Sequence, residues 1–338
     1  MKSKIALLTI SIFAGAVVIG ACFSSSGQTG STAQPVILIA LDGPLSKSKA
    51  ELSGLAWQDD MLILLPQYPE RFGKGDGVLF AIPKNEILDF LDGKSTQPIT
   101  PTEIQFSAPG LKDSIQGFEG YEAIAFSDKN IYLTIESGKN EEMMGYLVGG
   151  QISADQSEIH IDTARVVKIP PPVLIDNHTD EALIITGNRI LTFFEVNGVK
   201  LNSNPVAHVF GLDLSQQGTI SFPNLEYRVT DAALGPDGQI WVINYFYPEE
   251  TYLLPEADPL AEKYGEASTD KKYPQVERLV LLNYDASGIT LTDVAPIQLE
   301  LIKDARNWEG LVALDQRGFL LVTDKFPGTM LAFVPMPK

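Results

Sequence analysis

The sequence predicts an all-β fold, a five-bladed β-propeller, and three observations carry this prediction. Short runs rich in Val, Ile, Leu, Tyr and Phe are separated by Gly, Pro, Asn and Asp turns, which is typical of β-strands. A short phrase returns five times, with 69, 59, 50 and 78 residues between successive opening positions, which indicates a repeat architecture. A strand-like run at 36–41 precedes the first repeat and has no partner of its own.

The repeated phrase consists of one oxygen-bearing side chain, one small residue and an apolar strand. Its five copies open on Ser53, Glu122, Glu181, Asp231 and Glu309. A turn and a second apolar strand follow each copy, and a polar or amphipathic residue comes fourteen positions after the opening residue, or fifteen in the last copy. These partner residues are Gln67, Glu136, Glu195, Tyr245 and Asp324.

Each repeat extends to several strands, as a propeller blade requires. The first repeat has strand-like runs at 52–57, 61–65, 78–82 and 102–106, and the second has them at 122–126, 131–135, 145–151 and 158–168. The third has runs at 181–185, 190–194, 206–214 and 219–227, and the fourth at 231–234, 240–243, 278–284 and 289–299. The fifth repeat stops one strand short, with runs at 309–314, 319–323 and 329–334.

The run at 36–41 can supply the strand that the fifth repeat lacks. As the outermost strand of the last blade it would join the two ends of the chain and protect a sheet edge. Five repeats and one spare strand therefore predict five blades, and six blades, one of them degenerate, are the alternative. The long segment 245–275, rich in Pro and charged residues, is either a lid over one face or a mobile insertion.

The start of the chain has the pattern of a targeting segment. Lys2 and Lys4 precede an apolar stretch at 5–19, which is followed by Cys22, the only cysteine among 338 residues. This stretch resembles a bacterial lipobox and is shorter than the roughly 20 residues of a membrane span. We expect a signal peptide at 1–21, a lipidated Cys22 with a flexible tether at 22–35, and the propeller at 36–338. A secretory peptide with an incidental cysteine, or an uncleaved anchor, is the alternative.

Charge limits the classes of partner. The net charge is −18, and loss of the two signal lysines would make it −20. A strongly acidic surface disfavours nucleic acid and wide contact with anionic lipid. We therefore expect a membrane partner only through the lipid, and an unknown small molecule or protein as ligand. With a single cysteine the chain can form no internal disulfide.

The repeat pattern also predicts a ring of side chains on the axis. The innermost strand of each blade lines the axis, so Ser53, Glu122, Glu181, Asp231 and Glu309 would form a ring. Pairing across each hairpin would bring a second ring beside the first, with Glu136 next to Glu122, Glu195 next to Glu181 and Asp324 next to Glu309. Glu119 is a more distant candidate, because the second repeat could also open there.

So many carboxylates in a confined site indicate either raised pKa values or a bound cation. An all-oxygen ring suits Ca²⁺, which accepts six to eight oxygen ligands in flexible geometry. Zinc is disfavoured, because no thiol is available and His160, His178 and His208 lie outside the repeated phrase. A water-filled axis lined by solvated acids remains the alternative.

A family resemblance adds to this interpretation. The phrase Glu309-Gly310-Leu311, followed by the apolar run 319–323 and Asp324, looks like the phytase-like propellers, whose domain is described as having esterase-like activity. The acidic openings are also similar to the calcium-activated nucleotidases, or apyrases. That resemblance implies a central calcium held by the five opening residues, Ser53, Glu122, Glu181, Asp231 and Glu309.

Two functions follow from these observations. The first is a lipid-anchored, non-catalytic binding or scaffold propeller with a structural calcium ion. The alternative is a calcium-dependent hydrolase of phosphoesters or esters, in which Glu136 or Glu195 acts as the base. The sequence contains no Gly-x-Ser-x-Gly elbow, no phosphate-binding Gly-rich loop and no His-Glu-x-x-His motif.

Overall fold

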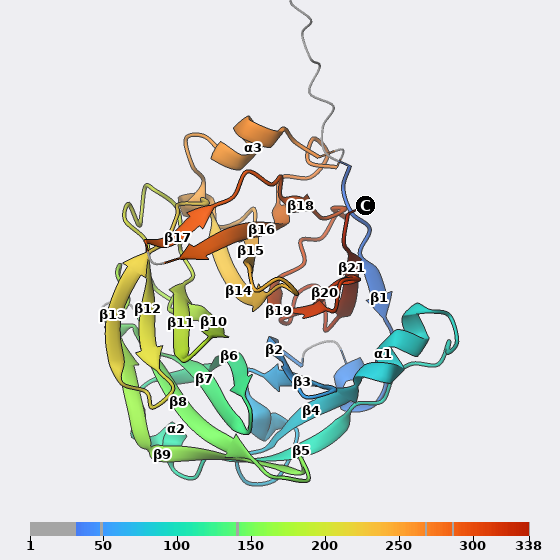
Figure 1. Cartoon of the computed structure of the whole chain (residues 1–338), viewed down its shortest axis with the longest axis vertical. Coiled ribbons are helices and arrows are strands. Elements are labelled where there is room, and N and C mark those ends of the chain that lie inside the picture. Colours follow the sequence, from blue (N-terminus) through green and yellow to red (C-terminus); the bar gives the residue numbers. More distant parts are fainter. Residues whose placement is uncertain (1–31, 48–49, 140–141, 268, 286, 338) are drawn as a thin grey trace, which may run out of the picture.

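The computed structural model describes residues 32–47, 50–139, 142–267, 269–285 and 287–337. Over these residues the fold is all-β, with strands grouped around a central axis (Figure 1). The predicted signal peptide and Cys22 lie outside the described residues, as does most of the predicted tether. No helix in the described part of the chain is long and apolar enough to cross a membrane.

The largest sheet contains the first two repeats. Its strand order is β2-β3-β4-β5-β9-β8-β7-β6. The bounds are β2 Leu52–Gln58, β3 Met61–Pro66, β4 Val78–Pro83, β5 Thr102–Ser107, β6 Phe118–Ser127, β7 Asn130–Ser137, β8 Met144–Ile152 and β9 Glu158–Ile169. Each half is an antiparallel set of four strands, and a parallel pairing of β5 with β9 joins the halves at their outer strands. The sequence did not predict this parallel junction.

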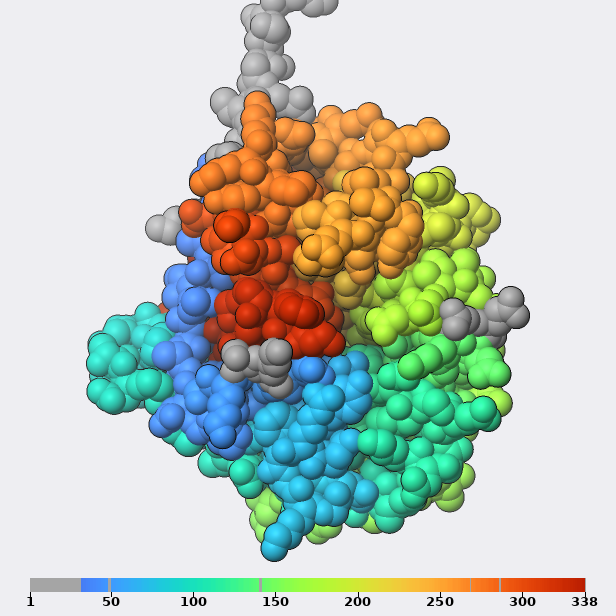
Figure 2. Space-filling view, turned by 180° about the vertical axis from the view of Figure 1, so that it is seen from behind, coloured from blue at the N-terminus to red at the C-terminus, as the bar shows by residue number. Residues whose placement is uncertain are grey.

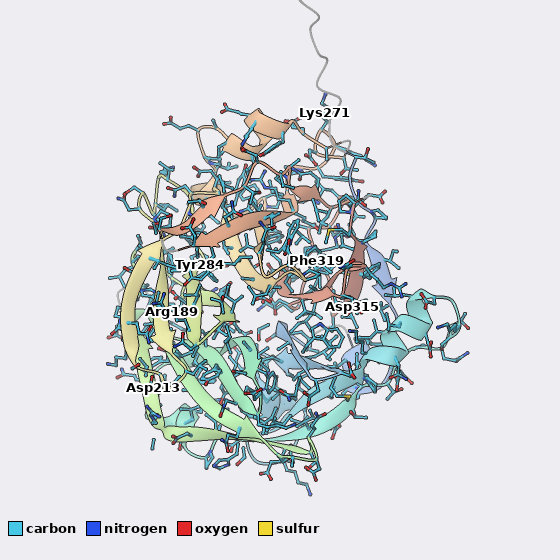
Figure 3. The ribbon with its side chains drawn as sticks, viewed as in Figure 1. Arg189, Asp213, Lys271, Tyr284, Asp315 and Phe319 are labelled. Carbon is cyan, nitrogen blue, oxygen red and sulfur yellow. The ribbon has the colours of Figure 1, made fainter. Side chains whose placement is uncertain are left out.

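Two further sheets contain the third and fourth repeats. The third has the order β10-β11-β12-β13, with bounds Asp180–Thr186, Arg189–Phe194, Val206–Gly211 and Gln216–Ser221. The fourth has the order β14-β15-β16-β17, with bounds Arg228–Leu234, Ile240–Phe246, Val276–Asp285 and Gly288–Leu291, and the short strand β18, Ile297–Gln298, also pairs with β16. The run predicted at 289–299 is therefore two strands, and the one predicted at 219–227 ends earlier. Between these sheets, Arg189 donates to the Tyr284 hydroxyl at 3.4 Å (Figure 3).

The last sheet contains both ends of the described chain. Its order is β1-β21-β20-β19, with bounds Ile37–Ile39, Leu331–Pro335, Gly318–Thr323 and Trp308–Leu314. The predicted partner of the fifth repeat is thus present, because β1 pairs antiparallel with β21 in the outermost position. From the rear, the blue N-terminal segment lies against the red C-terminal segment (Figure 2).

Helices are short and lie in the connections. They are α1 Lys84–Leu91, α2 Leu111–Ser114 and α3 Pro259–Tyr264, with 3-10 turns η1 Gly43–Ser46, η2 Pro69–Arg71 and η4 Thr251–Leu253. The sequence did not predict α1, which follows β4, or α3, which lies in the segment 245–275. An ion pair of Asp258 with the buried Arg278, at 2.8 Å, holds this segment against the sheet of the fourth repeat.

The innermost strands β2, β6, β10, β14 and β19 contact one another in a closed circle. Each of them carries a bulge at the repeated phrase, where its register with the next strand shifts. A bulge turns a side chain out of the normal alternation of a strand. In each inner strand, one side chain therefore points in a different direction from those of its neighbours. This side chain lies at the repeated phrase in all five repeats.

Strand pairing corrects the alignment of the fourth repeat. In the first repeat Leu52 pairs with Pro66 and Ser53 is bulged, whereas in the fourth Val229 pairs with Asn244. The residue equivalent to Ser53 is therefore Thr230, and the prediction of Asp231 is wrong by one position. Asp231 occupies the place of the small residue that follows, where the other repeats have Gly or Ala.

The axis differs between its two ends. At the end away from the bulged residues it is lined by apolar side chains, and the innermost of these are Leu55, Ile124, Leu183, Ala232 and Leu311. All five are buried. The same position of every repeat supplies one of them, which agrees with Thr230 as the opening residue. The polar residues therefore gather at the other end only.

We predict that the packing of β1, the outermost strand in the sheet of the fifth repeat, is essential for stability. Ile39 is buried in the core next to the first sheet, whereas its neighbour Leu38 points outward and is 56% exposed. Ile39→Asp would bury an unpaired charge and should cost about 3 kcal/mol or more of unfolding free energy. Leu38→Asp is the matched control and should change it by about 0.5 kcal/mol at most. Urea unfolding measures both, and equal effects would contradict the burial of β1.

Candidate ligand site on the axis

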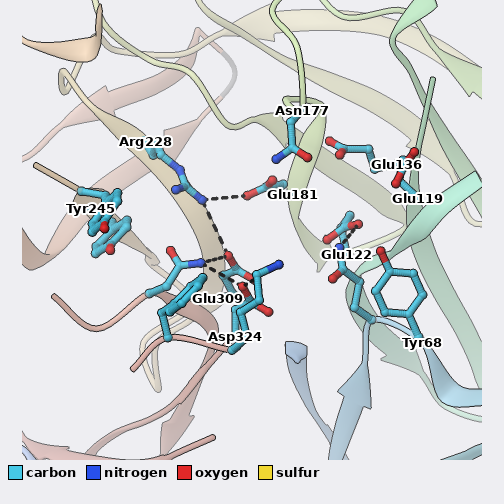
Figure 4. Close-up of a pocket in the computed structure, with 15 residues that line it drawn as sticks. Tyr68, Glu119, Glu122, Glu136, Asn177, Glu181, Arg228, Tyr245, Glu309 and Asp324 are labelled. Atoms are coloured by element: carbon cyan, nitrogen blue, oxygen red, sulfur yellow. Dashed lines mark hydrogen bonds and ion pairs between the residues drawn. The ribbon is translucent and has the colours of Figure 1, made fainter. Parts of the chain in front are cut away.

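A cavity of about 360 Å³ opens at the polar end of the axis (Figure 4). We call it the axial cavity. Its charged lining consists of Glu119, Glu122, Glu136, Glu181, Glu309, Asp324, Arg228 and Lys325. Gln67, Asn177, Asn307 and the aromatic rings of Tyr68, Tyr245, Tyr247 and Phe326 complete the lining.

Three of the five bulged residues line the cavity, and they are glutamates. Glu122, Glu181 and Glu309 come from β6, β10 and β19, and so from three different sheets. The other two are hydroxyl residues that join neighbouring repeats. Ser53 donates to the Tyr121 carbonyl at 2.6 Å, and Thr230 donates to the Trp308 carbonyl at 2.5 Å. The ring is therefore a triad of carboxyl groups and not a complete circle.

Asp231 is turned away from the axial cavity. Its carboxylate accepts hydrogen bonds from the backbone N–H of Ala232 at 2.8 Å and of Leu311 at 2.6 Å. It is buried, and burial raises its pKa, while the two N–H groups act in the opposite direction. Like Ser53, Asp231 joins neighbouring repeats, and neither residue lines the cavity.

The predicted second ring is only partly present. Gln67, Glu136, Tyr245 and Asp324 line the axial cavity, whereas Glu195 does not. The bulges also change the predicted pairs, because Glu136 lies opposite Gly120 in the ladder instead of Glu122. In the same way Glu195 binds the Thr179 carbonyl and Asp324 binds that of Asn307 through their backbone N–H groups, at 3.0 and 2.9 Å.

The residue that organises the site was not predicted. Arg228 is buried and lies two positions before Thr230 on β14. Its Nε donates to Glu195, its Nη1 pairs with Glu250 at 3.3 Å, and its Nη2 lies 3.8 Å from Glu181 and 3.7 Å from Glu309. One guanidinium therefore contacts the carboxyl groups of Glu181 on β10 and Glu309 on β19 (Figure 4), that of Glu195 just after β11, and one in the segment 245–275.

Glu195 is the anchor of this guanidinium. Its side chain is fully buried and also pairs with Nδ1 of His178, whose Nε2 contacts the Tyr252 hydroxyl at 2.7 Å. Burial alone would raise the pKa of Glu195, but Arg228 and then His178 lower it to about 2. Glu195 therefore carries a negative charge at neutral pH. It is held inside the protein and does not reach the ligand space, although it was one of the two predicted catalytic residues.

The carboxyl groups that line the cavity behave in the opposite way. Burial, followed by the charge of neighbouring carboxylates, raises the pKa of Glu122, Glu181 and Glu309 well above the usual range. The same causes, with Glu195 as the main neighbour, raise the pKa of Glu136 to about 8. The protonated form of each of these groups is therefore favoured relative to that of an exposed carboxyl group.

Several oxygen atoms in the cavity lack a hydrogen-bond partner among the described residues. They are Oε2 of Glu181, Oδ1 of Asn307 and Oδ1 of Asp324. Glu122 and Glu136 are better satisfied, since Gln67 donates to the first at 3.1 Å and Thr179 to the second at 3.2 Å. Buried acceptors without partners are uncommon, so this wall of the cavity is complementary to a donor or a cation.

The described residues contain no group of three or more His, Cys, Asp or Glu side chains arranged closely enough to hold a metal ion. The side chains would have to converge before they could share one ion. The oxygen-only character of the lining nevertheless fits a hard cation better than zinc or copper.

Comparisons with known proteins give the fold and no family. No family model and no curated protein matches the sequence. A GH32 β-fructofuranosidase of Bombyx mori in complex with sucrose is similar at 10% identity and a TM-score of 0.50, over 88% of this chain and 62% of that one. A sucrose-6-phosphate hydrolase of Lactobacillus gasseri is similar at 11% identity and a TM-score of 0.50, over 88% of this chain and 60% of that one.

The chain therefore spans about three fifths of the length of these two proteins. At such low identity the likeness shows the fold alone, an all-β fold of the propeller type. Neither protein is a phytase-like propeller or an apyrase, so the family resemblance drawn from the repeats stays a prediction.

The raised pKa of Glu136 predicts a loss of stability with rising pH. Its folded-state pKa of about 8 exceeds the usual 4.5, so its contribution is complete below pH 4.5 and is lost as the pH rises through 8. Each such group adds a slope of up to about 1.4 kcal/mol per pH unit. Urea unfolding between pH 5 and 8 should show a smaller slope for Glu136→Gln than for wild type. The exposed Glu103→Gln is the control, and a slope equal to wild type in Glu136→Gln would contradict the prediction.

Proposed function

We propose that the protein is a five-bladed propeller that binds a ligand at the axial cavity through a central Ca²⁺ ion and has no catalytic role. The observation that carries this proposal is the triad of Glu122, Glu181 and Glu309. Three separate strands direct these buried carboxyl groups into one cavity. Their raised pKa values mean that a cation would release protons and gain strong ligands.

The donor set supports calcium among the common metals. Besides the triad, Asp324 and Asn307 also line the cavity, and each has a buried oxygen atom with no hydrogen-bond partner among the described residues. Ca²⁺ takes six to eight oxygens from carboxylates, amide carbonyls and water in flexible geometry. The proposed ligands are thus the carboxyl groups of Glu122, Glu181 and Glu309, together with the unpaired oxygen atoms of Asp324 and Asn307. Ser53 and Asp231 are left out of it because hydrogen bonds hold them elsewhere.

The proposed fold and location complete this function. Four antiparallel strands per repeat and the circle of five inner strands support a count of five blades. The lipobox-like stretch that ends at Cys22 supports a lipid-anchored, extracytoplasmic protein of the bacterial cell envelope. The mouth of the cavity carries Tyr247 and Phe326, both partly exposed, and these rings could contact a ligand above the ion.

A hydrolase of phosphoesters or esters is the second candidate. One observation favours it, namely that Glu136 lines the cavity and keeps a proton near neutral pH, as a general acid must. Glu195 is a poor base for this reaction, since it is ionised but sealed behind Arg228 and His178. A bound Ca²⁺ would polarise an ester or phosphoryl oxygen. The two similar solved structures are named as sugar hydrolases, and glycoside hydrolysis belongs in the same test.

The calcium proposal predicts a metal-dependent midpoint of thermal unfolding. Ligand at 100 times its dissociation constant stabilises a folded protein by about 2.7 kcal/mol. Added Ca²⁺ should therefore raise the midpoint of the wild-type protein over that in chelator. Glu181→Gln combined with Glu309→Gln should abolish this rise. An identical rise in the double variant, or none in wild type, would contradict the central site.

The hydrolase candidate predicts turnover that depends on Glu136. Calcium-loaded protein would be assayed with p-nitrophenyl phosphate, a nucleoside diphosphate, p-nitrophenyl acetate and sucrose. Loss of general acid catalysis in Glu136→Gln should lower kcat by about 100-fold or more. If wild type turns over none of these compounds, or if Glu136→Gln equals wild type, the non-catalytic role stands alone.

A further inference from the structure

We infer that Arg228 is a resident cation of the axial cavity, and that it competes with a divalent metal ion for Glu181 and Glu309. This inference rests on the proposed function, because it concerns the same site. It adds a regulatory contact that links the metal site to the segment 245–275.

The position of the guanidinium is the first argument. Its Nη2 lies 3.8 Å from Oε2 of Glu181 and 3.7 Å from Oε1 of Glu309. It is thus placed between two of the three glutamates of the triad. These distances are longer than hydrogen bonds, so the guanidinium is near both oxygens and saturates neither. Oε2 of Glu181 has no hydrogen bond among the described residues.

Distance and charge give the second argument. Calcium binds oxygen at 2.3–2.6 Å, so an ion shared by Glu181 and Glu309 would lie a few ångströms from the guanidinium. Arg228 is buried, and the repulsion of two cations is weakly screened at a buried site. Arg228 cannot lose its proton to relieve this repulsion, because a guanidinium group is not deprotonated in proteins. Metal binding therefore requires the guanidinium to retreat from the triad.

The third argument is that Glu250 provides the guanidinium with a carboxylate partner outside the triad. Its Nε is fixed by Glu195, and its Nη1 already lies 3.3 Å from Oε1 and 3.5 Å from Oε2 of Glu250. Glu250 belongs to the segment 245–275, close to Tyr252, which contacts His178. A shift of Arg228 away from Glu181 and towards Glu250 would exchange one carboxylate for another. The segment 245–275 thus supplies the carboxylate that lets a metal ion enter.

Titration calorimetry with CaCl₂ on the full chain tests this competition. Arg228→Gln should bind Ca²⁺ more tightly than wild type, by a factor on the order of 100, because one close like-charge repulsion is removed. Arg228→Lys keeps the charge and should stay close to wild type. Glu250→Gln should weaken binding, since the displaced guanidinium loses its second partner. Arg317→Gln, an exposed residue paired with Asp92, removes the same charge elsewhere and is the matched control.

The outcomes separate this inference from the proposed function. Tighter binding in Arg228→Gln supports the inference, also when wild type binds no calcium, in which case only the proposed function is overturned. If wild type and Arg228→Gln bind calcium equally, the competition is overturned and the proposed function stands. If neither binds, both are overturned. Should Arg228→Gln fail to fold, because it leaves Glu195 unpaired, Glu250→Gln decides, and binding equal to wild type overturns the inference.

Discussion

The buried ion pair of Glu195 with Arg228 is the interaction on which the axial site depends. Glu195 has no contact with solvent, so its charge is tolerable only while Arg228 and His178 compensate it. The pair fixes the guanidinium at the edge of the cavity, where it divides its remaining attraction among Glu181, Glu250 and Glu309. Arg228 and His178 keep Glu195 ionised, whereas the glutamates of the triad have no cation of their own among the described residues to compensate a negative charge. That difference makes the cavity wall complementary to a hydrogen-bond donor or a cation.

The bulges decide which side chains take part in this site. At each repeated phrase the inner strand holds one residue more than its partner, and that residue leaves the regular alternation. Where it is a glutamate, a carboxyl group enters the cavity. Where it is Ser53 or Thr230, the shorter side chain instead donates a hydrogen bond to a backbone carbonyl of the next repeat. The same backbone feature therefore places a carboxyl group in the cavity at three positions and joins neighbouring repeats at two.

The sequence predicted the strands, their grouping by repeat and the pairing of the N-terminal strand with the last repeat, because alternation and repetition are local signals. It misplaced the fourth repeat because Asp231 resembles the acidic openings, while the equivalent Thr230 does not. Arg228 could not be found in this way, since the corresponding residues Glu51, Gly120, Thr179 and Asn307 share no chemistry. Its partners Glu195 and Glu250, with His178 beyond them, come together only through tertiary packing. The rule that would have revealed it is physical, namely that a cluster of buried acids requires an internal cation.

The pairing of β1 with β21 also has a consequence for how the protein acquires its fold. Ile37 and Phe333 are paired although almost the whole chain separates them. Among the described residues, β21 is the only strand with which β1 forms a ladder, so β1 has no strand partner until residues 331–335 have been synthesised. Contacts between such distant residues form slowly, because the intervening chain must lose much of its freedom first. We therefore expect the pairing of the two ends to be a late step of folding, and an open circle with unpaired strand edges to be prone to aggregation before it.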